Sequence, residues 1–261
     1  MPHSTTEDTD GQVKNLYFTT EARCAILGAV RTYGQYCPIA RGAEIFAERW
    51  TPLIIRNLHL GCGNFTEILE GAPGLSRTLL SERLKQLERL GIVESAPKPG
   101  RRGHHYELTP AGHELFTVCQ SLGEWGARWL EIAPENLDPF VALWSMCNAL
   151  RRDRLPDRRI VIRFDFTGRP RSERYWLIIE FGDTEICKTY PGFEEDLYIT
   201  AEAEAFVKWH AGHLTWAQAT RQDRIQLDGP APLVRAFPTW NARSMFAHIR
   251  PVSRTAPRPA G

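Results

Sequence analysis

The stretch SRTLLSERLKQLERL, residues 76–90, decides how the N-terminal part of this chain is expected to fold. At 100° per residue, Leu80, Leu84 and Leu87 fall on one side of a helix and indicate its buried face. Ser76 follows a Pro-Gly turn and is a good N-cap residue. The stretch therefore predicts an amphipathic helix. Its polar surface carries Thr78, Ser81, Glu82, Lys85 and Arg89, with Arg77 near its start.

The segments on either side predict which elements surround this helix. Upstream, residues 38–90 have a helical pattern that breaks at 61–63 and 71–74. Downstream, two short strand patterns flank a loop with two prolines, two glycines and three basic residues, which is typical of a hairpin. Thr109-Pro110 then starts a helix that runs to about residue 130. Helices, a basic hairpin and a further helix are the order of a winged helix-turn-helix.

The charge of the chain is unevenly spread. The whole sequence of 261 residues has a formal net charge of only +1, which by itself argues against nucleic acid. Residues 76–105 contain seven basic and three acidic side chains, a local net charge of +4. Such a concentration supplies the salt-dependent part of DNA affinity. The alternative is a solvated helix face beside a charged loop.

A helix that begins with Ser, Arg and Thr suits a major groove, because these side chains reach base edges and phosphates. Its free N–H groups also favour phosphate. The hairpin tip adds three basic side chains that can lie along the adjacent DNA backbone or in the minor groove. The predicted DNA-binding residues are Ser76, Arg77, Thr78, Ser81, Arg83, Lys85, Lys98, Arg101 and Arg102.

Several motifs in this region resemble the HxlR-type family of bacterial transcription regulators. They are CPIAR at 37–41, ERWTPLIIRNL at 48–58, NFTEI at 64–68, GLS at 74–76, LLSERLKQL at 79–87, GIV at 91–93 and YELTPAG at 106–112. The resemblance covers about residues 37–130, with every motif in order. It implies a winged-helix homodimer that binds operator DNA. Residues 21–35 and the helix over 110–130 would make the dimer contact, so that two recognition helices meet half-sites about one DNA turn apart.

The C-terminal half has a different pattern. Helical patterns at 138–150, 201–210, 215–220 and 230–237 alternate with strand patterns at 160–166, 175–181, 184–190, 196–200 and 224–227. The turns at 167–170 and 182–183 favour antiparallel hairpins. Residues 138–240 resemble sterol carrier protein type-2-like domains. The resemblance implies an α+β domain with a mainly antiparallel sheet and an apolar cavity.

The aromatic residues of this half predict a pocket for a hydrophobic small molecule, which would act as an effector. The alternative is that they fill a closed core. The candidate lining residues are Trp144, Phe164, Trp176, Phe206, Trp209 and Trp216.

Cys37 offers another form of control. Some members of the resembled family sense electrophiles through a cysteine at the matching position, and Cys37 precedes Pro38 at an expected helix N-terminus. The alternative is a small packed residue without redox chemistry. Six scattered cysteines form no C-x-x-C pair, so neither a zinc ribbon nor a disulfide scaffold is indicated. We expect no metal, no cofactor and no catalytic constellation.

The length predicts two domains. We expect a disordered tail over 1–20, a winged helix-turn-helix domain over 21–133, a sterol-carrier-like domain over 134–248 and a disordered tail over 249–261. The polar, acidic N-terminus lacks the layout of a signal peptide, and no apolar run reaches about 18 residues. We therefore expect a cytoplasmic protein that does not bind membranes.

Overall fold

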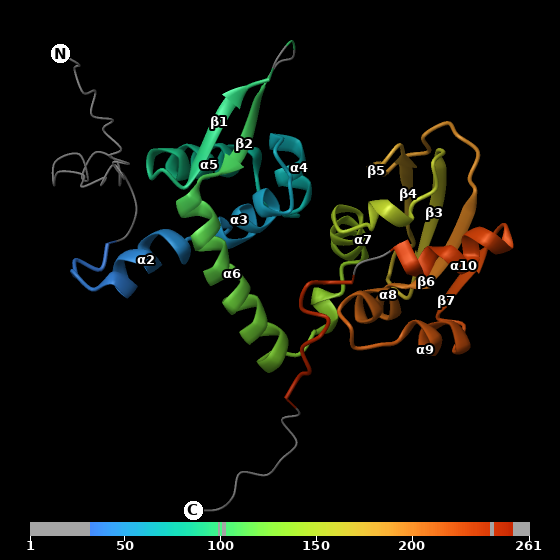
Figure 1. Cartoon of the computed structure of the whole chain (residues 1–261). Coiled ribbons are helices and arrows are strands. Elements are labelled where there is room, and N and C mark those ends of the chain that lie inside the picture. Colours follow the sequence, from blue (N-terminus) through green and yellow to red (C-terminus); the bar gives the residue numbers. More distant parts are fainter. Residues whose placement is uncertain (1–31, 99, 101–102, 241–242, 253–261) are drawn as a thin grey trace, which may run out of the picture. The chain divides into compact units, whose positions relative to one another are not determined.

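The structure, a computed structural model, describes residues 32–98, 100, 103–240 and 243–252 (Figure 1). The chain divides into two compact units, 1–48 and 49–261, and each is described by itself. The tail predicted over 1–20 lies outside the described residues. The tail predicted over 249–261 is described only as far as Val252, without regular structure.

The described part of the first unit contains helix α2 (Pro38–Phe46). The carboxylate of Glu44 accepts hydrogen bonds from Thr32 Oγ1 and from the Tyr33 backbone N–H, both at 2.7 Å. The sequence pattern at residues 21–36 also predicts a helix, most of which lies outside the described residues. Its last five residues are not helical, and that part of the prediction is wrong. Gly34 adopts a left-handed φ of 64°, which a continuing helix does not tolerate.

The second unit begins with the predicted order of helices, hairpin and helix (Figure 1). The elements are α3 (Thr51–His59), α4 (Phe65–Glu70), α5 (Arg77–Arg89), β1 (Val93–Pro97), β2 (His104–Leu108) and α6 (Pro110–Trp129). Strands β1 and β2 are antiparallel, with Val93 opposite Leu108. Both side chains are buried, which fixes the base of the hairpin to the helices.

Helix α6 starts against the hairpin. The Thr109 hydroxyl accepts a hydrogen bond from the Gly112 N–H, as expected of an N-cap. The Thr109 N–H in turn donates to the carbonyl of Ile92 at 3.1 Å. A Cβ at Gly112 would collide with the same carbonyl, so this close approach requires glycine.

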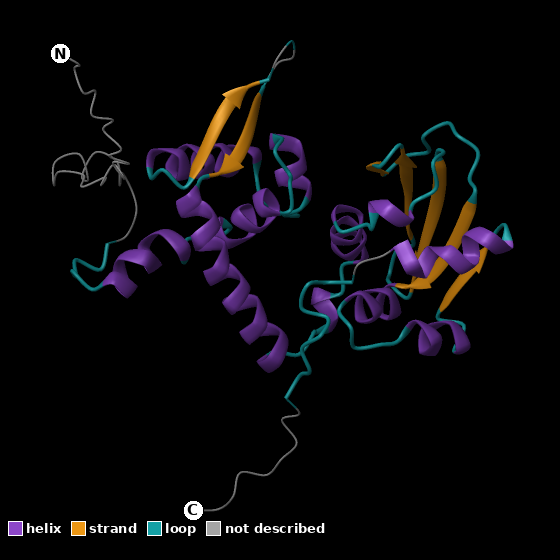
Figure 2. Ribbon diagram, viewed as in Figure 1, coloured by secondary structure: helices purple, strands orange, loops and turns teal. Residues whose placement is uncertain are grey.

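The rest of the unit is an α+β arrangement around one sheet (Figure 2). Its helices are α7 (Pro139–Asn148), α8 (Ala203–His210), α9 (Trp216–Arg221) and α10 (Ala231–Trp240), with the short 3-10 helices η1 (Pro134–Asn136) and η2 (Arg152–Arg154). The strands are β3 (Ile160–Thr167), β4 (Glu173–Glu180), β5 (Asp183–Cys187), β6 (Leu197–Glu202) and β7 (Ile225–Asp228).

The strand order is β5-β4-β3-β6-β7. The pairs β3–β4, β4–β5 and β6–β7 are antiparallel, whereas β3 and β6 are parallel. The mainly antiparallel sheet is therefore confirmed. Side chains at Ile160, Ile162, Phe164 and Phe166 alternate onto one face, where they form the core with residues of α7, α8 and α10. The domain boundary near residue 133 lies between α6 and α7 and stays a prediction.

Candidate nucleic-acid interface

Helix α5 is amphipathic, as its sequence predicts. Leu80, Leu84 and Leu87 are 0%, 1% and 2% exposed and pack on the core of the helix-turn-helix. Ser76 caps the helix, because its hydroxyl accepts a hydrogen bond from the Leu79 N–H at 3.2 Å. The leucine face therefore fixes which side of α5 remains available to a ligand.

The opposite side of α5 brings together most of the predicted contact residues. Arg77, Thr78 and Lys85 are exposed. The Arg77 guanidinium lies 5.1 Å from the ring centroid of Phe65 on α4, which orients it at the start of the helix. Ser81 and Arg83 are only half-buried, and Arg83 Nη1 donates to Gln86 Oε1 at 2.8 Å.

The β1–β2 hairpin supplies the second part of the interface. Lys98 follows β1, and its backbone N–H donates to the Gly103 carbonyl at 3.1 Å, which closes the hairpin tip. Arg101 and Arg102 lie outside the described residues. A hairpin after the capped helix gives the two-part arrangement of a wing beside a recognition helix.

A buried polar network joins α3 and α4, the two helices that precede α5 in the chain. The sequence pattern does not predict this network. Asn57 on α3 is 0% exposed, and its Nδ2 donates to the Ile68 carbonyl on α4 at 2.8 Å. Its Oδ1 accepts two hydrogen bonds from the Arg56 guanidinium, at 2.8 and 3.0 Å. Arg56 Nη2 also donates to the carbonyl of Gly71, in the turn between α4 and α5. Arg56 and Asn57 thus tie α3 to the segment that leads into α5.

Helix α6 exposes an apolar stripe. Val118, Leu122, Trp125 and Trp129 are 46%, 49%, 53% and 43% exposed. They recur at intervals of four, three and four residues, so they share one face of the helix. Phe116, in contrast, is buried and stacks on His59 of α3. The apolar surface of α6 is therefore larger than the part of it that the core of the helix-turn-helix buries.

These features agree with the comparisons with known proteins. The family model of HxlR-like helix-turn-helix proteins matches residues 45–134. The HTH-type transcriptional regulator YvaP of Bacillus subtilis is 34% identical over 106 residues, which cover 96% of YvaP and 40% of this chain. The chain belongs to the HxlR-like helix-turn-helix family. The family resemblance of its N-terminal part is confirmed.

Two further relatives match the same part of this HxlR-like chain. The HTH-type transcriptional regulator YodB of Bacillus subtilis is 37% identical over 97 residues, or 87% of YodB and 36% of this chain. An HTH-type transcriptional regulator of Mycobacterium tuberculosis is 37% identical over 95 residues, which span 58% of its length and 35% of this chain. A crystal structure of diamide-treated YodB, at 37% identity, covers 34% of this chain and 91% of YodB with a TM-score of 0.30.

The cysteines of this HxlR-like chain occupy different environments. Cys37 is half-buried at the N-cap of α2. The flanking glycines of Cys62 favour exposure, but that prediction is wrong, because its side chain is 3% exposed. Its Sγ donates to Asn148 Oδ1 on α7 at 3.6 Å. Burial, with the nearby Glu67 carboxylate, raises the pKa of the Cys62 thiol to about 12.

The residues predicted to line an apolar pocket divide among three places. Phe164, Phe206 and Trp209 are at most 4% exposed and belong to the core between the sheet and its helices. Trp216 packs against this core. Trp176 is buried outside this cluster, and its Nε1 donates to Glu195 at 3.0 Å. The pocket built from these residues stays a prediction.

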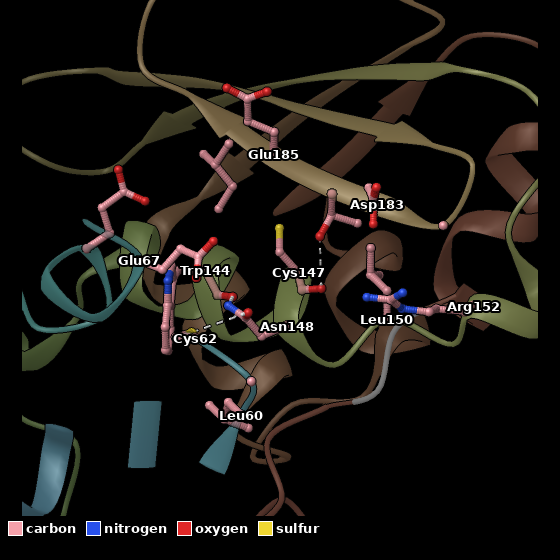
Figure 3. Close-up of a pocket in the computed structure, with 15 residues that line it drawn as sticks. Leu60, Cys62, Glu67, Trp144, Cys147, Asn148, Leu150, Arg152, Asp183 and Glu185 are labelled. Carbon is pink, nitrogen blue, oxygen red and sulfur yellow. Dashed lines mark hydrogen bonds between the residues drawn. The ribbon is translucent and has the colours of Figure 1, made fainter. Parts of the chain in front are cut away.

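Trp144, the sixth residue of that set, lines a cavity of about 490 Å³ between the α3–α4 loop, α7 and the β4–β5 turn (Figure 3). Its walls are largely polar. Carboxylates of Glu67, Glu70, Asp183 and Glu185 line it together with the Arg152 guanidinium. Burial raises the pKa of Glu70. This cavity does not suit a purely apolar molecule.

No helix among the described residues is long and apolar enough to cross a membrane. Within the same ranges, no three His, Cys, Asp or Glu side chains gather as ligands of a metal ion.

Proposed function

We propose that this protein is a transcription regulator that binds operator DNA through α5 and the β1–β2 hairpin. The observation that carries the proposal is the capped helix α5. Its leucine face is buried, while Arg77, Thr78 and Lys85 are exposed on the other side. Membership of the HxlR-like helix-turn-helix family supports the same function.

The two parts of the interface have different tasks. Arg77 and Thr78 stand in the first turn of α5, where side chains reach base edges and the free N–H groups favour phosphate. Ser76 and Ser81 add hydroxyls beside them. The remaining basic side chains contact phosphates and make affinity fall as salt rises; they are Arg83, Lys85, Lys98, Arg101 and Arg102.

The regulator acts as a homodimer in this proposal. The stripe of Val118, Leu122, Trp125 and Trp129 on α6 gives an apolar surface that a second copy can cover. A two-fold dimer presents two copies of α5 to half-sites about 10 base pairs apart. Of the other predicted dimer segment, residues 21–35, only residues 32–35 lie within the described part of the chain.

A small hydrophobic molecule controls operator affinity in this proposal. The chain carries over a hundred residues after the family match. The sterol-carrier-like fold that we propose for these residues is one that binds such molecules. Trp144 of α7 packs where a Cβ on Gly71 would lie, directly beside the turn before α5. An effector acts through such a contact only if it binds one arrangement more tightly than another.

The substitution Arg77→Ala tests the assignment of base contacts to α5. We expect it to reduce discrimination between an operator and unrelated DNA by about 1–3 kcal/mol, because a base contact is lost. Lys98→Ala should weaken binding to all sequences and reduce the salt slope by about one. Fluorescence titrations of a selected operator and of unrelated DNA at several salt concentrations measure both effects.

Arg235→Ala is the matched control, since Arg235 is an exposed arginine on α10. It should leave both DNA affinities unchanged. If Arg77→Ala weakens operator and unrelated DNA by the same factor, Arg77 makes no base contact and the assignment is wrong.

A second candidate for control is the thiol of Cys37. Its position as N-cap of α2, immediately before Pro38, favours this alternative because peptide N–H groups at a helix start attract negative charge. In that case diamide should change the operator affinity of the parent and of Cys187→Ser, but not of Cys37→Ser. A Cys37→Ser protein that responds like its parent excludes control at Cys37.

A further inference from the structure

A second cavity, of about 190 Å³, lies between α3, α6 and the segment 243–252 that follows α10. Its walls are mainly apolar, and two of them, Phe116 and Phe246, are aromatic. Leu122 and Met245 also line it. Met245 is not part of the α6 stripe that a second copy covers in the proposed dimer, and at 43% exposed it opens the cavity to solvent. The cavity is distinct from the polar one at Trp144.

The segment 243–252, which forms one wall of this cavity, is held by backbone hydrogen bonds near both of its ends. The Ser244 N–H donates to the His210 carbonyl on α8 at 3.0 Å, and the Val252 N–H donates to the Arg128 carbonyl on α6 at 2.8 Å. Between them, the Phe246 ring occupies the space where a Cβ on Gly123 of α6 would lie. The chain therefore builds this wall with a segment outside the helix-turn-helix.

We propose that this cavity, and not the aromatic pocket predicted for the C-terminal half, is the effector site, and that it takes a neutral, monocyclic aromatic molecule. An apolar cavity of about 150 Å³ stays dry and binds benzene, so the volume found here suits one substituted aromatic ring. The rings of Phe116 and Phe246 provide aromatic partners for it. The larger cavity at Trp144 does not suit this molecule, because four carboxylates line it.

Arg56 connects the cavity with the recognition helix. Its side chain lines the cavity, while its Nη2 donates to the Gly71 carbonyl in the turn before α5. Its guanidinium also lies 5.3 Å from the ring centroid of Trp144. A molecule in the cavity contacts the side chain that positions this turn. The effector role rests on the proposed DNA-binding function, whereas occupancy of the cavity does not.

The site is tested first without DNA, with toluene as the probe. The chain has three methionines, so methyl-labelled methionine gives few, resolvable NMR signals. We expect toluene to shift the Met245 methyl signal saturably because Met245 lines the cavity. The buried Met146 lies in the core of the sheet and should not respond. An unchanged Met245 signal, or a shift of Met146 alone, overturns the site.

Two variants then test whether binding depends on this cavity. Cys119→Met adds side-chain atoms inside the cavity, and Cys187→Met makes the same change at another half-buried cysteine, on β5. Toluene affinity, followed at Met245, should fall at least about tenfold in Cys119→Met and stay unchanged in Cys187→Met. Equal affinity in both variants overturns the placement. If Cys119→Met does not fold, the Met245 and Met146 signals of the parent protein still decide the site.

The effector role is tested with a selected operator. Toluene should change the operator affinity by about fivefold or more, the usual range of allosteric coupling, and in Cys119→Met this change should be lost. A saturable Met245 shift without any change in operator affinity overturns the effector role. If the protein without toluene binds no DNA at all, the proposed function fails instead, and the Met245 signal still decides the site.

Discussion

Replacing Asn57 with leucine is expected to reduce the free energy of unfolding by about 3 kcal/mol, although leucine is similar in size. Asn57 is fully buried, and the substitution removes its hydrogen bonds to the Ile68 carbonyl and to Arg56. A buried group left without its partner costs about 1–3 kcal/mol, and more when the group is charged. Denaturant unfolding followed by circular dichroism measures the loss.

The same substitution should weaken operator binding even without denaturant, where the protein is still folded. The reason is that Arg56 loses the partner that orients it toward Gly71. Asn136→Leu is the control, since Asn136 is an exposed asparagine in η1, and its loss of stability should stay within about 0.5 kcal/mol. A loss below about 1 kcal/mol in Asn57→Leu would show that the network adds little to stability.

Phe206→Ala is expected to cost about 3–5 kcal/mol, the usual range for a phenylalanine removed from a closed core. The Phe206 ring is 0% exposed, and its centroid lies 5.9 Å from that of Phe164 and 5.1 Å from that of Phe166. These contacts, on α8 and β3, hold the helices against the sheet. The measurement is again equilibrium unfolding, with the slope against denaturant checked for two-state behaviour.

Phe181→Ala serves as the control, because that ring is 81% exposed. It should change stability by less than about 0.5 kcal/mol. The comparison also bears on the predicted aromatic pocket. A cost below about 1 kcal/mol for Phe206→Ala contradicts the tight core and favours a cavity at this position.

The sequence predicted α5 well because its signal is local. Leu80, Leu84 and Leu87 repeat at helical spacing, and Ser76 precedes them as a cap, so the buried face follows from neighbouring residues alone. The hairpin is predicted equally well, because prolines and glycines separate its two strands.

The features that the sequence does not predict depend on contacts between residues that are far apart in the chain. Cys62 is buried beside Asn148, which lies on α7 far along the chain, and its flanking glycines give no sign of this. Asn57 interrupts an apolar run, a pattern that indicates exposure more often than a buried network. The segment 243–252 has no periodicity, and its packing against Gly123 follows only from the tertiary fold.

Selection of DNA from a random duplex library with the full-length protein tests the central proposal most directly. We expect enrichment of two inverted half-sites about 10 base pairs apart, centre to centre, because α5 of each protomer meets one major groove. The selected DNA should bind about 1000-fold more tightly than the starting library, and its affinity should fall steeply with salt. A recovered pool that binds no more tightly than the starting library would contradict the proposed operator recognition.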